Sequence, residues 1–447
     1  MLDLSRKNLN RTILTLAWPA VLENLLQTSV YIVDSIFIGR LGTQAFAAVG
    51  QSSMILFTVI FIFYGVGVAT GAIVARNLGR NDVISAGKAA GQGMVLAVAI
   101  GLVIAILGLM YGEQAMTLLG TEPDVIARAG NYMRIIFGFS IVRLFIYIGS
   151  GILRAAGDTR TPLMATGIMN VFNIVGDWVL IFGIGPFPEM GIEGAALATG
   201  LSYCIGASIL IYKLFWSHST FRIRGRDLWT FNSGYMKTII RVALPNIGEQ
   251  MVTQGAYFAF LGIVTSLGTT AMAAHFMAIR VEMISFMPVF GLSMAVSAIV
   301  GQSLGAEKPD IAELAVKKSA QIGLISMSAL SAVFLIVPGA LVSIYSPAPD
   351  VYVLAVLCIR IAALELPSSA LMMIYTGAMR GAGDTFSPML IGFFGAIFLR
   401  VGMLYLLTIE LGWGLAGVWW GTVIDWGVRM AISYVLFRRG RWKKIEL

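Results

Sequence analysis

Residues 154–162 read RAAGDTRTP and residues 380–388 read RGAGDTFSP, so the chain carries nearly the same nine residues twice. The second string follows the first by 226 positions (380 against 154), and the same offset relates AIVARNLG at 72–79 to AIVGQSLG at 298–305. Chance similarity would not keep the same offset between matching strings so far apart along the chain. The sequence therefore predicts that the whole chain is a duplication.

The composition indicates a membrane protein. Hydrophobic residues make up 58% of the chain and charged residues only 12%, and the mean hydropathy is +0.84. Soluble domains are about one quarter charged, whereas helices that cross a bilayer exclude charge over roughly 20 residues. The apolar runs are continuous and do not alternate with polar residues, which excludes an outer-membrane barrel. We expect an all-α polytopic membrane protein.

Apolar stretches are spread evenly along the chain, with centres roughly at residues 25, 61, 99, 142, 172, 203, 251, 287, 327, 366, 398 and 426, which indicates about twelve transmembrane helices. Each copy then holds about six helices, so both copies enter the membrane from the same side and a pseudo-twofold axis along the membrane normal relates them. We expect an N-terminal six-helix lobe at 1–220, a linker at 221–238 and a C-terminal six-helix lobe at 239–447.

Lys and Arg gather on one side of the predicted membrane. They precede the first helix, follow the second, fill the linker and end the chain: Arg6, Lys7, Arg11, Arg76, Arg80, Lys88, Arg222, Arg224, Arg226, Lys237, Arg438, Arg439, Arg441, Lys443 and Lys444. The positive-inside rule places both termini and the linker in the cytoplasm. The net charge of +8 is then charge that faces lipid headgroups, and a nucleic-acid partner is not expected.

Signals of enzymatic chemistry are missing from the sequence. It contains no Gly-rich nucleotide loop, no Ser/His/Asp set and no cluster of metal ligands. Cys204 and Cys358 lie in apolar runs of different halves, so they build neither a disulfide framework nor a metal site. We expect neither an enzyme nor a resident cofactor.

The repeated string falls in a short loop between the fourth and fifth predicted helices of each copy. Gly157 and Gly383 suit a tight turn at a helix C-terminus, and Asp158 and Asp384 suit capping of the next helix. The prolines that end the strings suit the first turn of that helix. We interpret the string as a turn that marks the duplication, in preference to a binding site.

Polar residues inside the predicted helices mark the candidate functional site, because a charged group at the bilayer midplane costs several kcal/mol. At about 100° per residue they form one stripe in each of two helices: Glu23, Gln27, Tyr31 and Asp34 in the first, and Asn170, Asn173 and Asp177 in the fifth. The second copy has Phe260, Leu399 and Met403 at the positions of Asp34, Asn173 and Asp177. The acidic cluster therefore belongs to the first lobe only.

The chemistry of this cluster allows three interpretations. Two carboxylates with an amide and a hydroxyl supply oxygen ligands for a hard monovalent cation. A close pair of carboxylates can instead share a proton. Either arrangement would make the cluster a site that couples ion movement to transport, whereas a hydrogen-bonded network between packed helices would be purely structural.

Three motifs together resemble one family. They are P-x3-E-x3-Q-x6-D-x-IFIGRLG over residues 19–42, the two RxAGDTxxP strings, and FMPVFGLSMAVSAIVGQSLGA over residues 286–306. The chain is identified on them as a member of the multidrug and toxic compound extrusion (MATE) family over essentially its whole length. The resemblance implies twelve helices in two lobes and export of organic cations in exchange for Na+ or H+. It also implies a prokaryotic plasma (inner) membrane.

The resemblance implies specific residues for the coupling ion. The family's first-lobe cation site falls on Asp34, Asn173, Asp177 and, in the sixth helix, Thr199, which makes Na+ a possible metal at these four residues. Acids of the NorM-type branch in the seventh and tenth helices correspond here to Thr253 and Ser369. This difference favours the DinF-like branch, with coupling in the first lobe.

A substrate cleft between the two lobes is expected, with acidic and aromatic groups that suit a lipophilic cation. Glu249 is the repeat partner of Glu23, and Met277 belongs to a Met-rich segment that could form an adaptable apolar wall. The candidate cleft residues are Glu23, Gln27, Tyr31, Glu249, Thr253, Tyr257, Met277 and Glu282.

The sequence thus predicts a cation-coupled antiporter that exports lipophilic organic cations by alternating access, acting as a monomer in the bilayer. The alternative is a flippase for lipids or lipid-linked saccharides of the same fold group. A flippase for pyrophosphate headgroups should line its cavity with Arg and Lys. The charges nearest the predicted cleft are mainly acidic, which favours the exporter.

Overall fold

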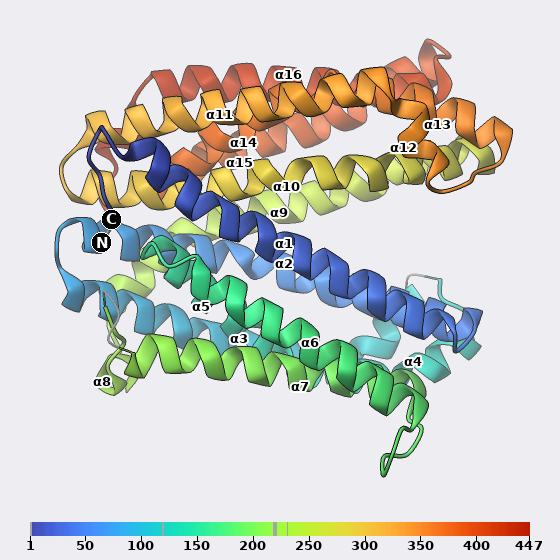
Figure 1. The fold of residues 1–447 in the computed structure, drawn as a ribbon, viewed down its shortest axis with the longest axis horizontal. Coiled ribbons are helices and arrows are strands. Elements are labelled where there is room, and N and C mark those ends of the chain that lie inside the picture. The colour runs from blue at the N-terminus through green and yellow to red at the C-terminus, as the bar shows by residue number, and fades with distance from the viewer. Residues whose placement is uncertain (1, 119, 218–220, 230) are drawn as a thin grey trace. The chain divides into compact units, whose positions relative to one another are not determined.

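The computed structural model describes residues 2–118, 120–217, 221–229 and 231–447, and the regular elements within those ranges are all helices (Figure 1). Internal contacts divide the chain into two compact units. The first unit is Pro19–Ala243, and the second unit combines Leu2–Trp18 with Leu244–Leu447.

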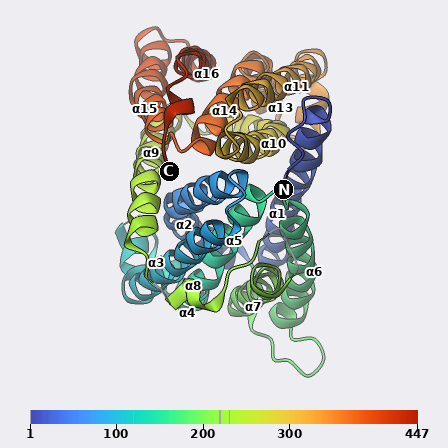
Figure 2. The same ribbon diagram turned by 90° about the vertical axis from the view of Figure 1, so that its left-hand side faces the viewer.

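The first unit is a helical bundle. In it α2, α3 and α5 pack against one another, as Figure 2 shows, and α6 packs along α7. Its elements are α1 (Leu9–Gly39, from Pro19 onward), α2 (Thr43–Gly79), α3 (Val83–Leu118), α4 (Pro123–Gly138), α5 (Ser140–Ala155), α6 (Arg160–Phe182), α7 (Gly191–Ile211), η1 (Tyr212–Trp216) and α8 (Gly225–Trp229).

The second unit repeats this plan around α10, which packs against α11, α13 and α14. Its fifth span differs from that of the first unit, because α15 continues into the wider turns of two π-helices. Its elements are α9 (Ser233–Ser266, from Leu244 onward), α10 (Thr269–Gly305), α11 (Pro309–Ile336), α12 (Pro338–Ser343), α13 (Pro349–Ala362), α14 (Leu366–Gly381), α15 (Phe386–Phe394), η2 (Gly395–Met403), η3 (Leu406–Glu410), α16 (Gly414–Arg438) and η4 (Arg441–Lys444).

The predicted all-α membrane fold is confirmed. Within the described residues, eight helices are long and apolar enough to cross a membrane, and two bent pairs raise that number to ten. These pairs are α4 with α5, bent by 45°, and α13 with α14, bent by 50°. The remaining two predicted positions are occupied by α9 and α16, which carry buried charges such as Glu249 and Asp425. Such charges lower the mean hydropathy of a helix.

The boundaries of the units differ from the predicted 1–220, 221–238 and 239–447. Residues 2–18 belong to the second unit, where Leu9 and Ile13 of α1 are fully buried in its apolar core. The predicted linker belongs to the first unit, where Nε2 of Gln92 on α3 donates to the Asp227 carbonyl of α8 at 3.0 Å. The divisions inside α1 and α9 fall beside Pro19 and Pro245; proline removes a helical hydrogen bond and permits a bend.

The repeated strings form the predicted turns. Gly157 and Gly383 follow their helices with φ of 92° and 91°, a left-handed conformation that glycine adopts without steric cost. Asp158 then caps α6, accepting from the backbone N of Thr161 at 3.0 Å and from its hydroxyl at 2.7 Å. Asp384 caps α15 in the same way through Ser387.

Two glycines permit close helix packing at matching places in the two units. A Cβ added at Gly194 of α7 would lie 2.6 Å from the Leu180 carbonyl oxygen of α6, and one at Gly417 of α16 would lie 2.8 Å from the carbonyl of Leu407. Because backbone atoms cannot rotate away, the helices would have to separate. We expect Gly194→Ala and Gly417→Ala each to cost about 1–3 kcal/mol.

Thermal unfolding of the purified protein in detergent checks this prediction through a lower melting temperature for both variants. The matched control is Gly255→Ala, because a Cβ at Gly255 within α9 has nothing within 4 Å. Alanine is the better helix former, so this control should keep or raise the melting temperature. Equal melting temperatures for all three variants would contradict the packing role of Gly194 and Gly417.

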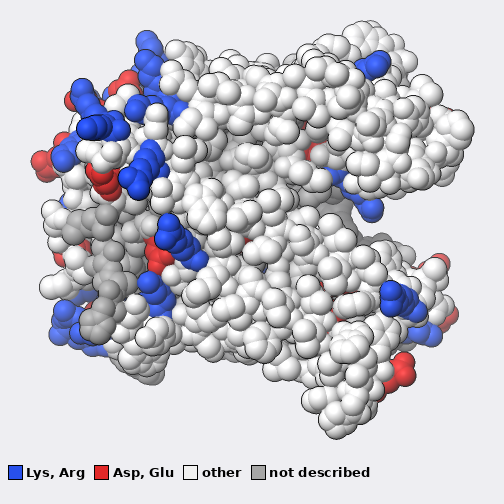
Figure 3. All heavy atoms as spheres, viewed as in Figure 1, with Lys and Arg blue, Asp and Glu red and all other residues white. Residues whose placement is uncertain are grey.

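Charged side chains show the banding of a membrane-spanning bundle. Figure 3 shows Lys and Arg gathered at the end of the second unit where the C-terminus lies in Figure 1, while the flanks of that unit are almost uncharged in this view. Arg438, Arg439 and Arg441 belong to the last turn of α16 and the segment after it. The assignment of this end to the cytoplasm stays a prediction.

Candidate functional site

The candidate site is built on two facing carboxylates of the first unit, Asp34 on α1 and Asp177 on α6. They lie within hydrogen-bonding reach of each other. Asp177 is fully buried, and among the described residues no donor reaches either of its carboxylate oxygens or Oδ1 of Asp34. An ionised carboxylate can only accept hydrogen bonds. Two facing carboxylates therefore need a proton or another cation between them.

The amide of Asn173 lies one helical turn before Asp177. Its Nδ2 donates to Oγ1 of Thr199 on α7 at 3.2 Å, while its buried Oδ1 has no donor among the described residues. The four residues predicted for a cation thus come from α1, α6 and the neighbouring α7, with a further free oxygen beside the carboxylate pair. No group of three or more His, Cys, Asp or Glu that could hold a metal occurs in the described chain, so Na+ here would depend on this amide and hydroxyl.

Sequence reasoning left Arg143 without a role, and the structure places it near this site. Its guanidinium carbon lies 4.4 Å from the ring centroid of Phe57 and 5.5 Å from that of Tyr203. Tyr132 and Tyr203 interact electrostatically with both Arg143 and Asp34. The hydroxyl of Tyr132 lies 3.3 Å from that of Ser53. An arginine inside an apolar run was the signal, but the sequence does not show its aromatic neighbours.

Glu23 and Glu249, predicted to line a substrate cleft, are held by the arginines of the repeated strings. Nη1 of Arg154 contacts Oε1 and Oε2 of Glu23 at 2.9 and 3.0 Å, and Nη2 of Arg380 donates to Oε1 of Glu249 at 2.7 Å. Both carboxylates are buried, at 5% and 7% exposure. Each unit therefore neutralises its own acid locally, and neither acid offers an uncompensated negative charge to a substrate.

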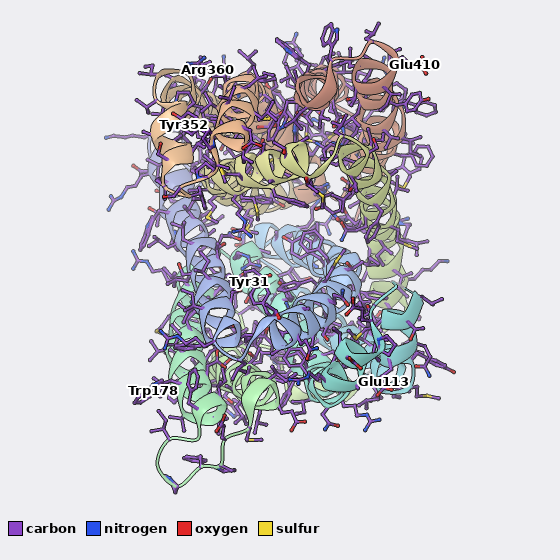
Figure 4. The ribbon with its side chains drawn as sticks, turned by 90° about the vertical axis from the view of Figure 1, so that its right-hand side faces the viewer. Tyr31, Glu113, Trp178, Tyr352, Arg360 and Glu410 are labelled. Carbon is purple, nitrogen blue, oxygen red and sulfur yellow. The ribbon has the colours of Figure 1, made fainter. Side chains whose placement is uncertain are left out.

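The other candidate cleft residues of the first unit are exposed. Gln27 and Tyr31 lie on the same stretch of α1, and Figure 4 shows Tyr31 there. Tyr31 packs edge-on against Phe57, with ring centroids 6.4 Å apart. These two residues remain available for contact with a substrate.

Two of the candidate cleft residues in the second unit already have partners within that unit. Thr253 donates to the carbonyl of Glu249 in its own helix at 2.8 Å, and Met277 packs against the apolar core. Tyr257 remains exposed and stacks on Phe260 with centroids 6.4 Å apart. The eight candidates are divided between two units, so a common cleft stays a prediction.

Glu282 has an acidic partner that sequence reasoning did not assign. It lies within hydrogen-bonding reach of Glu365, and both are buried in the second unit. Asp425 of the same unit pairs with Arg429 one turn later in α16 at 2.5 Å, and Nε of Arg400 lies 3.1 Å from the other oxygen of Asp425.

A model of one protein family fits the chain twice. The model described as MatE matches residues 19–179 and again residues 245–406. The chain belongs to the MATE family. The two matches begin 226 residues apart, which is the offset between the repeated strings, so the duplication is confirmed as a feature of this MATE protein.

Relatives of this MATE protein match along almost its whole length. A probable multidrug resistance protein NorM of Thermotoga maritima is 30% identical over 440 residues, which cover 98% of this chain and 94% of the relative. Another of that name, from Mesorhizobium japonicum, is 31% identical over 450 residues, covering 96% and 93%.

A solved structure described as the outward-facing conformation of a multidrug resistance MATE family transporter of the MOP superfamily has a TM-score of 0.90 at 25% identity. The match covers 96% of this chain and 95% of that one. The protein is therefore a transporter of the MATE family and not an enzyme, as predicted. The choice between the DinF-like and NorM-like branches stays a prediction.

Proposed function

We propose that this MATE transporter is an antiporter that exports lipophilic organic cations in exchange for Na+ or H+. The observation that carries the proposal is the pair Asp34 and Asp177, whose buried oxygens face each other without donors among the described residues. Buried unpaired charge inside a membrane protein marks ion pathways and proton relays. A cation therefore binds at this pair during part of the transport cycle.

Coupling follows if the ion and the substrate have different affinities for the two states of the carrier. The carboxylate pair of Asp34 and Asp177 joins α1 to α6. Nδ2 of Asn170 on α6 also donates to the Leu26 carbonyl of α1 at 2.6 Å. Cation binding alters the packing of these two helices and lowers the affinity for substrate in the outward state. The empty carrier then returns and binds substrate from inside.

The membrane and its orientation are part of the same proposal. The gathering of Lys and Arg at the chain termini and in the segment around α8 supports an orientation with both termini in the cytoplasm, and the bacterial MATE relatives support a plasma (inner) membrane. The transporter is proposed to act as a monomer on small-molecule organic cations and to need no resident cofactor.

The rival function is a lipid or lipid-linked saccharide flippase. The facing carboxylates of Asp34 and Asp177 in the first unit would repel the anionic pyrophosphate headgroup that such a flippase would carry. The observation thus supports the exporter over the flippase.

Transport by purified protein in proteoliposomes tests this choice. We expect a fluorescent organic cation to leave the vesicles when an inward Na+ or H+ gradient is imposed, and the gradient that works identifies the coupling ion. In parallel, vesicles with a fluorescent lipid in one leaflet should show no faster lipid transfer than vesicles without protein. Lipid transfer with no dye movement under either gradient would replace the exporter by the flippase.

A further inference from the structure

A second pair of facing carboxylates lies in the second unit, at positions unrelated to the first pair by the duplication. Glu282 of α10 and Glu365, which precedes α14, are within hydrogen-bonding reach and 9% and 2% exposed. The offset of 226 relates them to Leu56 and Phe139, which are both apolar. The pair therefore occurs in the second unit only and is not a repeat copy of Asp34 and Asp177.

The backbone around the pair is irregular at membrane depth. Glu282 is 13 residues into α10 (282 against Thr269), about 20 Å along the helix at 1.5 Å per residue, and the hydrocarbon core is about 30 Å thick. Glu365 occupies the 50° break between α13 and α14, and Pro367 lies in the first turn of α14. Broken helices at such depth are tolerated where they are buried or line a polar cavity, and they mark ion sites in transporters.

The charges around the pair do not balance. Arg400 in η2 acts electrostatically on both Glu282 and Glu365, and it also contacts Asp425, which pairs with Arg429. This network, in which Arg400 is partly exposed, holds three carboxylates and two guanidiniums, so one negative charge remains. Glu249 also interacts electrostatically with Arg429, but its charge is balanced by its ion pair with Arg380, so these two residues do not change the count.

The remaining neighbours do not supply the missing positive charge. Thr422 of α16 lies within hydrogen-bonding reach of Glu365 but is neutral, and its hydroxyl donates to the Trp419 carbonyl at 2.7 Å. His275 lies two turns before Glu282 on α10, and its ring packs between Phe260 and Trp419 at 5.2 and 5.6 Å without a charged group acting on it. Oε1 of Glu282 and Oε2 of Glu365 have no hydrogen-bond donor among the described residues.

We propose that the second unit holds one exchangeable proton between Glu282 and Glu365, at a binding site separate from the first-unit pair. The proton supplies the hydrogen bond that two ionised carboxylates cannot make and cancels the remaining charge of the network. A metal ion fits poorly, because the guanidinium of Arg400 repels it and the described part of the chain offers it two carboxylates and one hydroxyl. This site exists whether or not Asp34 and Asp177 couple transport.

Infrared spectroscopy of the purified protein at neutral pH tests the proposal, because only a protonated carboxyl group gives the carboxylic C=O stretching band. We expect Glu282→Gln and Glu365→Gln each to remove the intensity of one such group, since one acid then remains and ionises against Arg400. Conversely, Arg400→Met should add the intensity of one group, because the network then needs a second proton.

The control is Glu313→Gln, since Glu313 is exposed and paired with Lys443 at 2.6 Å; it should leave the band unchanged. Gel-filtration and melting profiles identify any variant that fails to fold. If a glutamine variant fails to fold, the band intensity of Arg400→Met compared with the wild type tests the proposal. Unchanged intensity in both glutamine variants, or in Arg400→Met, would overturn the site. Loss of intensity on adding Na+ at constant pH, measured in the double variant Asp34→Asn with Asp177→Asn so that the first-unit pair gives no band, would overturn the proton as its occupant.

Discussion

Replacing Asp34 or Asp177 by asparagine is expected to reduce gradient-driven export of a fluorescent organic cation to the level of vesicles without protein. Asparagine keeps nearly the same volume but cannot ionise, so the exchanged cation loses its counter-charge. A carrier whose two states bind the ion equally cannot be driven by its gradient. The measurement is the initial rate of dye efflux from proteoliposomes under the Na+ or H+ gradient that drives the wild type.

The control for this prediction is Glu113→Gln in the same unit. Glu113 is half-exposed, pairs with Arg134 at 3.5 Å and lies on α3, away from Tyr31 of α1 in Figure 4. It should export dye at the wild-type rate. If Asp34→Asn and Asp177→Asn also export at that rate, the coupling site lies elsewhere in the chain.

Breaking the ion pair between Glu23 and Arg154 is expected to have the largest effect on stability. The side chains are 6% and 11% exposed, and both carboxylate oxygens contact one guanidinium nitrogen. Glu23→Leu or Arg154→Met alone leaves a buried charge without its partner, which costs about 3–5 kcal/mol. The melting temperature of the purified protein in detergent should fall sharply for each single variant.

The double variant separates charge from packing. Glu23→Leu combined with Arg154→Met removes both charges and should recover most of the lost stability, because apolar replacement of a buried pair is often nearly neutral. Arg134→Met is the matched control, since its pair with Glu113 is 61% and 50% exposed and should contribute about 0–1 kcal/mol. A double variant no more stable than either single variant would show that packing, and not charge pairing, is the main contribution.

The helices and the first-unit site could be predicted because they depend on local pattern. Apolar runs gave the spans, and spacing along α1 and α6 placed Asp34 and Asp177 on faces that the structure brings together. The repeated turns follow from glycine and aspartate, whose conformational and capping preferences act within a few residues. The two matches of one family model then confirmed the duplication.

Partners far apart along the chain could not be predicted in this way. Arg154 reaches Glu23 across 131 residues, and Arg380 reaches Glu249 across the same separation. The sequence did contain a signal for these pairs, because Arg380 follows Arg154 by the same offset as Glu249 follows Glu23. The signal was not used, since turn formation and helix capping already explained the repeated strings. Glu365 was missed for a related reason: its role depends on a helix break and on Arg400 in a π-helix, and neither feature follows from hydropathy.

The most direct test of the central claim is the affinity of the purified transporter for a fluorescent organic cation, measured across Na+ concentrations and pH in detergent. Linkage requires that a coupled ion change this affinity, and a coupling of about 1.4 kcal/mol corresponds to a tenfold change. We predict at least that change with Na+ or with H+ in the wild type, and none in the double variant Asp34→Asn with Asp177→Asn. A wild-type affinity that is independent of both ions, or an ion dependence that survives the double substitution, would contradict coupling at this pair.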